Sequence, residues 1–377
     1  MNYLYVYLAY GSLFILGFID NSRGPIYPEL LSQFQVTKVQ GSLIFSLCSL
    51  SGFVVSLFVS RWLKFLGTIW ATRVALLTDF LACILMGFAP SSYHGFIQFV
   101  IAGVILGIGM GMKGICANLL IRKASNHHNR RRLFSGLHTM YGMASFFAPF
   151  IIAELFQLGL GFQRIFLYTS VLPIVLLITT FKTKPYTIQY KKPDTSSLSG
   201  SKVILIASIF ALYVSSEILV SSRLTIFLKE VHGYSLSQAA FNLSVFFGLL
   251  LVGRMSFGLF HVPFKSFNIM TGSIVLSFVV SILGMQFYPP LLALNGLSMS
   301  IFFPSAMDWV SEFFGEESEY VISRIMVTIS GSLVAMHYIF GLFAEHFGLA
   351  LSIWILPLLL FIAWYLLHFP LRKLTIS

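Results

Sequence analysis

Charged residues occur inside long apolar stretches of this sequence, where a charge is costly and often serves a function. The first are Asp20 and Arg23, near the middle of an apolar run that begins at Tyr3. A charge at bilayer depth costs at least about 2.5–3.5 kcal/mol on insertion scales, and is tolerated when it pairs or lines an aqueous cavity. Residues three apart share a helix face. The pair therefore predicts proton or substrate binding in a central cavity, with a structural ion pair as the alternative.

A second set, Glu217 and Arg223, occupies the corresponding region of a later apolar run. Six residues turn a helix by about 600°, so these side chains lie about 120° apart and cannot aim at one point. Glu217 is nearer the middle of its run and has no cation on its own face. We expect Glu217 to carry a proton and Asp20 to bind the substrate or a gate. Arg223 is predicted to join helices at an outer gate.

Lys113 follows the glycines Gly103, Gly107 and Gly111, whose spacing lets another helix approach closely. Lys113 is about 200° from Gly111 around the helix, so it points away from that packing face. We expect it to meet Asp20 across the cavity or to bind an anionic substrate. Snorkelling to the interface is the alternative.

Three further polar residues are candidates with an equally plain structural alternative. His138 can carry protons, because histidine titrates near neutral pH, or it can simply pack. Asp308 can form an inner gate with Arg324, or be solvated at the membrane interface. Asp79 is central in its apolar run, and no partner for it can be assigned from the sequence.

These residues must be positioned by membrane-spanning helices. The 377 residues are 57% hydrophobic and only 10% charged, whereas soluble domains are about 25% charged. Twelve apolar runs are long enough for spans of about 20 residues, and they are too long and too uniform for barrel strands. The runs cover residues 4–32, 39–60, 69–89, 95–121, 133–156, 164–181, 203–228, 237–260, 266–287, 290–314, 321–343 and 350–369.

The basic residues between these runs set the predicted orientation. With the N-terminus in the cytoplasm, the outer loops hold only Lys38, Arg164 and Lys229, while most other loop Lys and Arg residues are inside. Both termini are then expected in the cytoplasm, and the protein is expected in the cell membrane. The net charge of +11 therefore comes from basic residues in the cytoplasmic loops, which orient the protein in the membrane, and nucleic acid is not expected as a partner. The three cysteines lie in apolar runs and suggest neither disulfides nor a metal site.

The longest polar segment divides the chain into two equal sets of six helices. We predict an N-terminal bundle (1–181), a flexible cytoplasmic linker (182–201) and a C-terminal bundle (202–377). The predicted fold class is an all-α membrane protein with two pseudo-symmetric six-helix bundles. Six plus six helices around a basic linker is the parallel repeat of major facilitator transporters.

Short motifs occur in order across most of the chain. They are Gly17-Phe18-Ile19-Asp20-Asn21, Gly107-Ile108-Gly109-Met110-Gly111, Leu137-His138 with Tyr141-Gly142, Leu212-Tyr213-Val214 with Glu217, Phe246-Phe247-Gly248 with Gly253-Arg254, and Phe302-Phe303-Pro304. These segments resemble a sugar-transporting branch of that superfamily, the fucose permease-like and sodium-glucose-transporter-like proteins. Two segments depart from the family pattern. The stretch 64–68 lacks the acid usual between helices 2 and 3, and Lys113 stands where an acid is expected.

The resemblance implies a monomeric secondary active transporter of a small polar, sugar-like solute, coupled to an ion such as the proton and working by alternating access. No cofactor or metal is expected. The alternatives are a carrier of an anionic metabolite, which Lys113 and Arg23 favour, an exporter of a drug or lipid, and a non-transporting receptor. An enzyme is not expected, because H-E-x-x-H and G-x-S-x-G do not occur. The predicted substrate- or ion-binding residues are Asp20, Asn21, Arg23, Lys113, His138, Glu217, Arg223 and Asp308.

Overall fold

The structure, a computed structural model, describes residues 3–371 apart from 126–129, 184–199 and 260–262. All regular structure in this part of the chain is helical, and 12 helical segments are long and apolar enough to cross a membrane. Each predicted apolar run overlaps one of them, so the predicted number and order of spans are confirmed. The predicted linker lies almost wholly outside the described residues.

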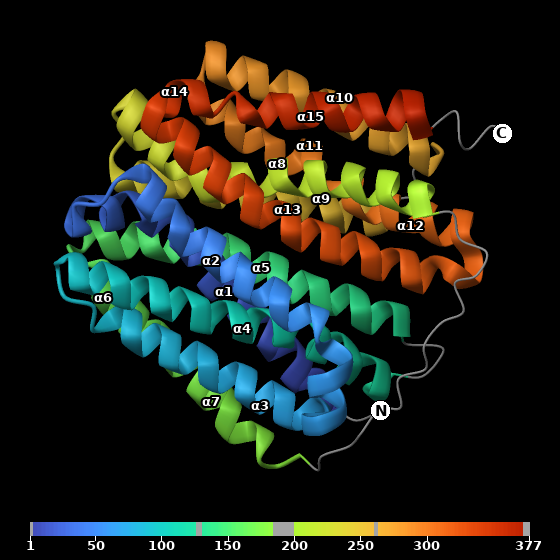
Figure 1. The fold of residues 1–377 in the computed structure, drawn as a ribbon, viewed down its shortest axis with the longest axis horizontal. Helices are drawn as coiled ribbons and strands as arrows, with labels where there is room; N and C mark the ends of the chain where they lie inside the picture. Colours follow the sequence, from blue (N-terminus) through green and yellow to red (C-terminus); the bar gives the residue numbers. More distant parts are fainter. Residues whose placement is uncertain (1–2, 126–129, 184–199, 260–262, 372–377) are drawn as a thin grey trace.

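The first half of the chain forms one bundle (Figure 1). Its spans pack mainly against one another, with α1 against α5 and α4, and α3 against α4, α6 and α7. The sixth span is made of two short helices in line, α6 and α7. The helices are α1 (Tyr3–Phe34), α2 (Lys38–Leu57), α3 (Val59–Gly87), α4 (Tyr93–Ala124), α5 (Arg130–Gln157), α6 (Phe162–Thr169) and α7 (Val171–Thr180).

The second half forms the other bundle, drawn above the first in Figure 1. Here α8 packs against α13, α15 and α9, and α10 packs against α12 and α15. The tenth and twelfth spans are again composite. The elements are α8 (Gly200–His232), α9 (Leu236–Leu259), α10 (Ser266–Gln286), η1 (Pro289–Leu294), α11 (Asn295–Ser300), α12 (Phe302–Phe314), η2 (Gly315–Glu317), α13 (Ser318–His346), α14 (Leu349–Ser352), α15 (Ile355–Leu366) and η3 (Leu367–Leu371).

The glycine face predicted for α4 is the surface on which α2 packs. A Cβ atom at Gly107 would lie 2.0 Å from the carbonyl oxygen of Cys48, and one at Gly111 would lie 2.7 Å from that of Gly52. Real Cβ atoms do not approach backbone oxygens so closely, so only glycine permits this contact. The predicted close helix approach is confirmed.

The two halves meet along three helix pairs, α2 with α13, α5 with α9, and α1 with α8. The start of α1 and the end of α15 lie on one side of the molecule (Figure 1), which we call the terminal side, and the opposite side is called distal. On the distal side α1 and α8 approach closely at Gly24, where a Cβ atom would lie 2.7 Å from the carbonyl oxygen of Ser221. The halves are therefore in direct backbone contact there.

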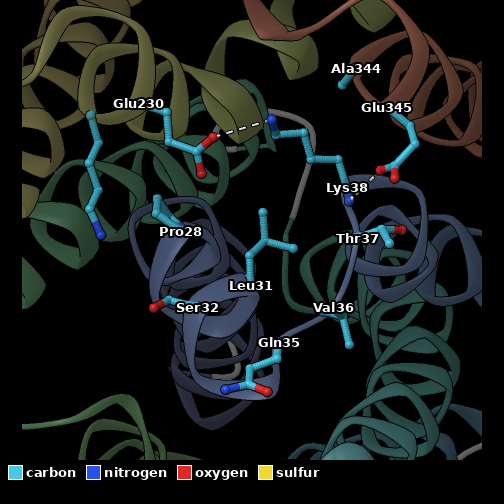
Figure 2. A pocket seen from close by; sticks show the side chains of 11 residues that line it. Pro28, Leu31, Ser32, Gln35, Val36, Thr37, Lys38, Glu230, Ala344 and Glu345 are labelled. Carbon is cyan, nitrogen blue, oxygen red and sulfur yellow. Dashed lines mark hydrogen bonds and ion pairs between the residues drawn. The ribbon is translucent and has the colours of Figure 1, made fainter.

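Polar contacts also join the halves at the distal end. The Lys38 ammonium lies 3.4 Å from a carboxylate oxygen of Glu230, and the Lys38 main-chain N–H donates to Glu345 at 3.0 Å. Figure 2 shows these residues around a pocket that is also lined by Leu31 and Pro28 of α1. Together with the close approach at Gly24, these contacts hold the halves closed on the distal side.

Candidate functional site

A polar cluster joins α1 to α5 close to the middle of the first bundle. Asp20 forms an ion pair with Arg23, as the three-residue spacing predicts, and it also accepts a hydrogen bond of 3.1 Å from the Tyr141 hydroxyl. The Asn21 amide donates to Ser145 at 2.9 Å. Of the ion pair, Asp20 is the more exposed, with 22% of its side-chain surface accessible. Asp20 can therefore accept a hydrogen bond from a solute while Arg23 balances its charge.

The corresponding cluster of the second bundle contains Glu217 and Arg254. Arg254 of α9 donates to Glu217 of α8 at 3.1 Å. Glu217 was predicted to have no cation on its own helix face, and its partner indeed comes from another helix, which the sequence did not indicate. His138 of α5 is exposed, and Arg254 is close enough to act on it electrostatically. The helices that carry the two clusters pack against each other across the halves, α1 against α8 and α5 against α9.

Arg223 is fully buried at the distal interface between the halves. Its guanidinium donates to Ser42 of α2 at 3.2 Å and lies 3.5 Å from the Nδ1 atom of His337 of α13. It also lies over the rings of Tyr27 and Phe45, with its central carbon 4.5 and 4.6 Å from their centroids. The predicted position between helices agrees with these contacts. A role in gating stays a prediction.

Lys113 does not face Asp20. It forms an ion pair with Asp79 of α3, and both side chains are completely buried inside the first bundle. The prediction failed because an angle around α4 fixes the direction of a side chain but not which neighbour fills that direction. The pair supplies the partner for Asp79 that the sequence could not assign, and it places Lys113 away from the interface between the halves.

Asp308 and Arg324 do not pair in the structure. Asp308 is exposed and accepts a hydrogen bond of 3.0 Å from Ser266, whereas Arg324 donates to the hydroxyl of Tyr320 at 2.9 Å. The expected inner gate between them is therefore not formed in this conformation. Asp308 lies toward the terminal side, where the alternative of interface solvation fits its exposure.

Two members of the site were not identified from the sequence. Arg254 was noted only as part of a family motif, although an arginine inside an apolar run carries the same signal as Arg23. Tyr141 likewise stands in the sequence only as part of a family motif, whereas in the structure its hydroxyl donates a hydrogen bond to Asp20. A charged residue inside an apolar run indicates a functional position for Arg254 as it does for Arg23.

The fold and the site define a polytopic helical membrane protein with polar groups of two bundles facing each other at mid-depth. The sequence matches the Major Facilitator Superfamily over residues 9–318. The chain belongs to this superfamily, and it is an integral, multi-pass membrane transporter of a small-molecule solute rather than an enzyme.

Solved transporters share this fold at low sequence identity. A crystal structure of a D-xylose-proton symporter superposes with a TM-score of 0.79 at 12% identity, covering 97% of each chain. An inward-open structure of the xylose transporter XylE from E. coli has a TM-score of 0.76 at 11% identity, covering 97% of this chain and 95% of that one. A bacterial homologue of the human lysosomal transporter Spinster, in an inward-facing conformation, has a TM-score of 0.75 at 14% identity, covering 98% and 96%. No curated protein sequence matches this chain.

Proposed function

We propose that this protein is a proton-coupled secondary transporter that moves a small polar, sugar-like solute across the cell membrane by alternating access. In this proposal both termini are cytoplasmic, so the distal side faces outward, and the protein acts as a monomer of two bundles, residues 1–181 and 202–377, joined by a linker. The motifs shared with sugar transporters and the fold shared with a D-xylose-proton symporter support the substrate class.

The observation that carries the proposal is the pair of carboxylates at mid-membrane, one in the first helix of each bundle. Asp20 lies near the middle of α1 and Glu217 near the middle of α8. Both keep some exposed side-chain surface, while the distal contacts around Gly24 and Arg223 are closed. A solute held between these clusters would therefore be released toward the terminal side in this conformation.

Glu217 is the proposed proton carrier. Its carboxylate is held by Arg254, and the pair is only partly accessible, with 13% of the Glu217 side chain and 32% of the Arg254 side chain exposed. Protonation removes the charge that holds Arg254, so the arginine is released when the proton binds. Because Arg254 lies on α9, which packs against α5 of the other bundle, this release changes the packing surface between the halves. Such a change is what links proton binding to rocking of the bundles.

Isosteric amides in proteoliposomes test these roles. Glu217→Gln should abolish accumulation driven by a pH gradient and retain exchange of solute without a gradient. Asp20→Asn should weaken solute binding by at least about tenfold, because a hydrogen bond to a charged group is lost. Glu312→Gln is the matched control, since Glu312 is exposed on α12. Normal affinity and normal coupling in both site variants would refute the assignment.

A carrier for an organic anion is a second candidate, and one observation favours it. Arg223 adds a buried positive charge at the interface between the halves, beyond the paired charges of the two clusters. A neutral sugar offers no charge to complement it.

A further inference from the structure

Three acids at mid-membrane each form an ion pair with a basic residue of their own half, and Arg223 belongs to none of these pairs. The pairs are Asp20 with Arg23, Glu217 with Arg254, and Asp79 with Lys113. In the part of the chain that the structure describes, no carboxylate pairs with Arg223. Arg223 is thus a fully buried cation at the interface between the halves without a paired carboxylate.

The surroundings of Arg223 compensate this charge only in part. Three aromatic rings surround the guanidinium, with Phe340 at 5.0 Å in addition to Tyr27 and Phe45, and cation–π contacts stabilise a desolvated cation. However, the Nε and Nη1 atoms of Arg223 have no hydrogen-bond acceptor among the described residues. Buried donors without acceptors are costly, and more so on a charged group.

Arg23 brings a second set of donors close to the same ring. Its guanidinium carbon lies 5.3 Å from the centroid of Phe45, while that of Arg223 lies 4.6 Å from it. The Nη1 atom of Arg23 is also buried without an acceptor among the described residues. Both arginines act electrostatically on His337, which stacks on Phe45. Two guanidinium groups from opposite halves thus present unused donors to one region.

We infer that the transported solute carries a carboxylate or phosphate group, which binds to Arg223 with Arg23 as a second donor. Guanidinium groups bind these oxyanions with paired, charge-assisted hydrogen bonds, which would use the free donors. This inference rests on the proposed transport function and narrows its substrate to an organic anion. The hydroxyl and amide groups of Tyr141 and Asn21 would then hold the polar remainder of the solute.

The same geometry explains how loading favours closure of the distal side. When the distal side closes, Arg223 of α8 is buried against α1, α2 and α13 with no carboxylate to balance its charge. Burying an unbalanced charge is unfavourable for the empty protein. A bound oxyanion supplies the missing charge and acceptors, so the loaded protein closes more readily. A ligand shifts such an equilibrium by its difference in affinity between the two states.

Matched solutes test the inference on the purified full-length protein. Thermal unfolding is measured with glucose, galactose and mannose, each as the neutral sugar, the uronate and the 6-phosphate, and with lactate and inorganic phosphate as small oxyanions. We expect one anionic form to raise the unfolding temperature while its neutral parent does not. A response to the uronate alone identifies a carboxylate group, and a response to the 6-phosphate alone identifies a phosphate group.

Variants at Arg223 link the response to the proposed site. Arg223→Gln should weaken anion affinity by about 30-fold or more, as expected when one partner of a buried charge pair is removed. Arg223→Lys keeps the charge without the planar donors, so it should fold and bind with intermediate affinity. Arg164→Gln, at an exposed arginine of α6, is the matched control and should bind normally.

Two results would overturn the inference. One is an anion response that survives in Arg223→Gln, and the other is a wild-type protein that responds to none of the anions. Uptake of the same solutes into proteoliposomes separates this failure from failure of the proposed function. Accumulation of a neutral sugar under a pH gradient would uphold the transport function and refute the anion. Anion binding through Arg223 without any transport would support the anion site and refute the transport function.

Discussion

Gly24 is the position where a single methyl group should shift the balance between distal-closed and distal-open conformations. A Cβ atom there would lie 2.7 Å from the carbonyl oxygen of Ser221 and 3.3 Å from Leu243 Cδ2. Both neighbours belong to the second bundle, so the added group opposes contact between the halves and leaves the packing of the first bundle unchanged. The obstructing atom is backbone, which cannot move aside as a flexible side chain can.

The expected size of the effect follows from overpacking at a tight contact. Inserting a methyl group into such a contact costs about 1–3 kcal/mol. A coupling free energy of that size changes an equilibrium by about 5- to 150-fold. Gly24→Ala should therefore reduce the ratio of distal-closed to distal-open molecules by a factor in that range.

Spin labels on the distal ends of the two bundles measure this ratio. His94→Cys on α4 and Gln286→Cys on α10 place labels at exposed positions, while the native cysteines are buried. Pulsed dipolar spectroscopy should show a longer distance gaining population in Gly24→Ala. Gly114→Ala is the matched control, because a Cβ atom at Gly114 would meet nothing within 4 Å. An unchanged distance distribution in folded Gly24→Ala would refute the reasoning.

Three further predictions concern stability, the distal ion pair and topology. Asp79→Asn or Lys113→Met should each lower the free energy of unfolding by about 3–5 kcal/mol, whereas combining Asp79→Leu with Lys113→Met should recover much of the loss, as measured by chemical denaturation in detergent. Lys38→Ala should change stability by less than about 1 kcal/mol, because its pair is partly exposed and its main-chain hydrogen bond is kept; a larger loss would show that the pair is a main distal contact. A cysteine at Ser91 should react with an impermeant reagent in intact cells while one at Ser125 should not, and the opposite result would reverse the proposed orientation.

The spans could be predicted from the sequence because they depend on a local property. A helix in the bilayer must satisfy its own backbone and expose apolar side chains, so each span leaves a long apolar run in the sequence. The Asp20–Arg23 pair was predictable for a similar reason, since both residues lie one turn apart on one helix. The close approach at Gly107 was also predictable, because small residues on one helix face let the backbone of another helix come close.

Partners on different helices could not be predicted in this way. The sequence fixes the direction of Lys113 around α4, but the neighbour in that direction is set by the packing of α3. Glu217 likewise has no cation on its own face, and Arg254 reaches it from α9. Single-helix geometry contains no information about such contacts, which depend on the arrangement of the whole bundle.

The distribution of charge pairs separates the parts that move together from the surface along which they move. The three ion pairs at mid-membrane, Asp20 with Arg23, Asp79 with Lys113 and Glu217 with Arg254, each join residues of the same half. Breaking a buried pair is costly, so each bundle resists internal rearrangement. Across the halves the described contacts include a neutral hydrogen bond from Ser244 to the Phe146 carbonyl, the hydrogen bond and ring contacts of the Arg223 guanidinium, and the partly exposed pair of Lys38 with Glu230. None of these contacts is a buried pair of opposite charges, so separating the halves does not leave an acid and a base unpaired in the membrane. Rocking of two firm bundles is therefore the motion that costs this protein least, and the cation of Arg223 lies where that motion can be controlled by what the site contains.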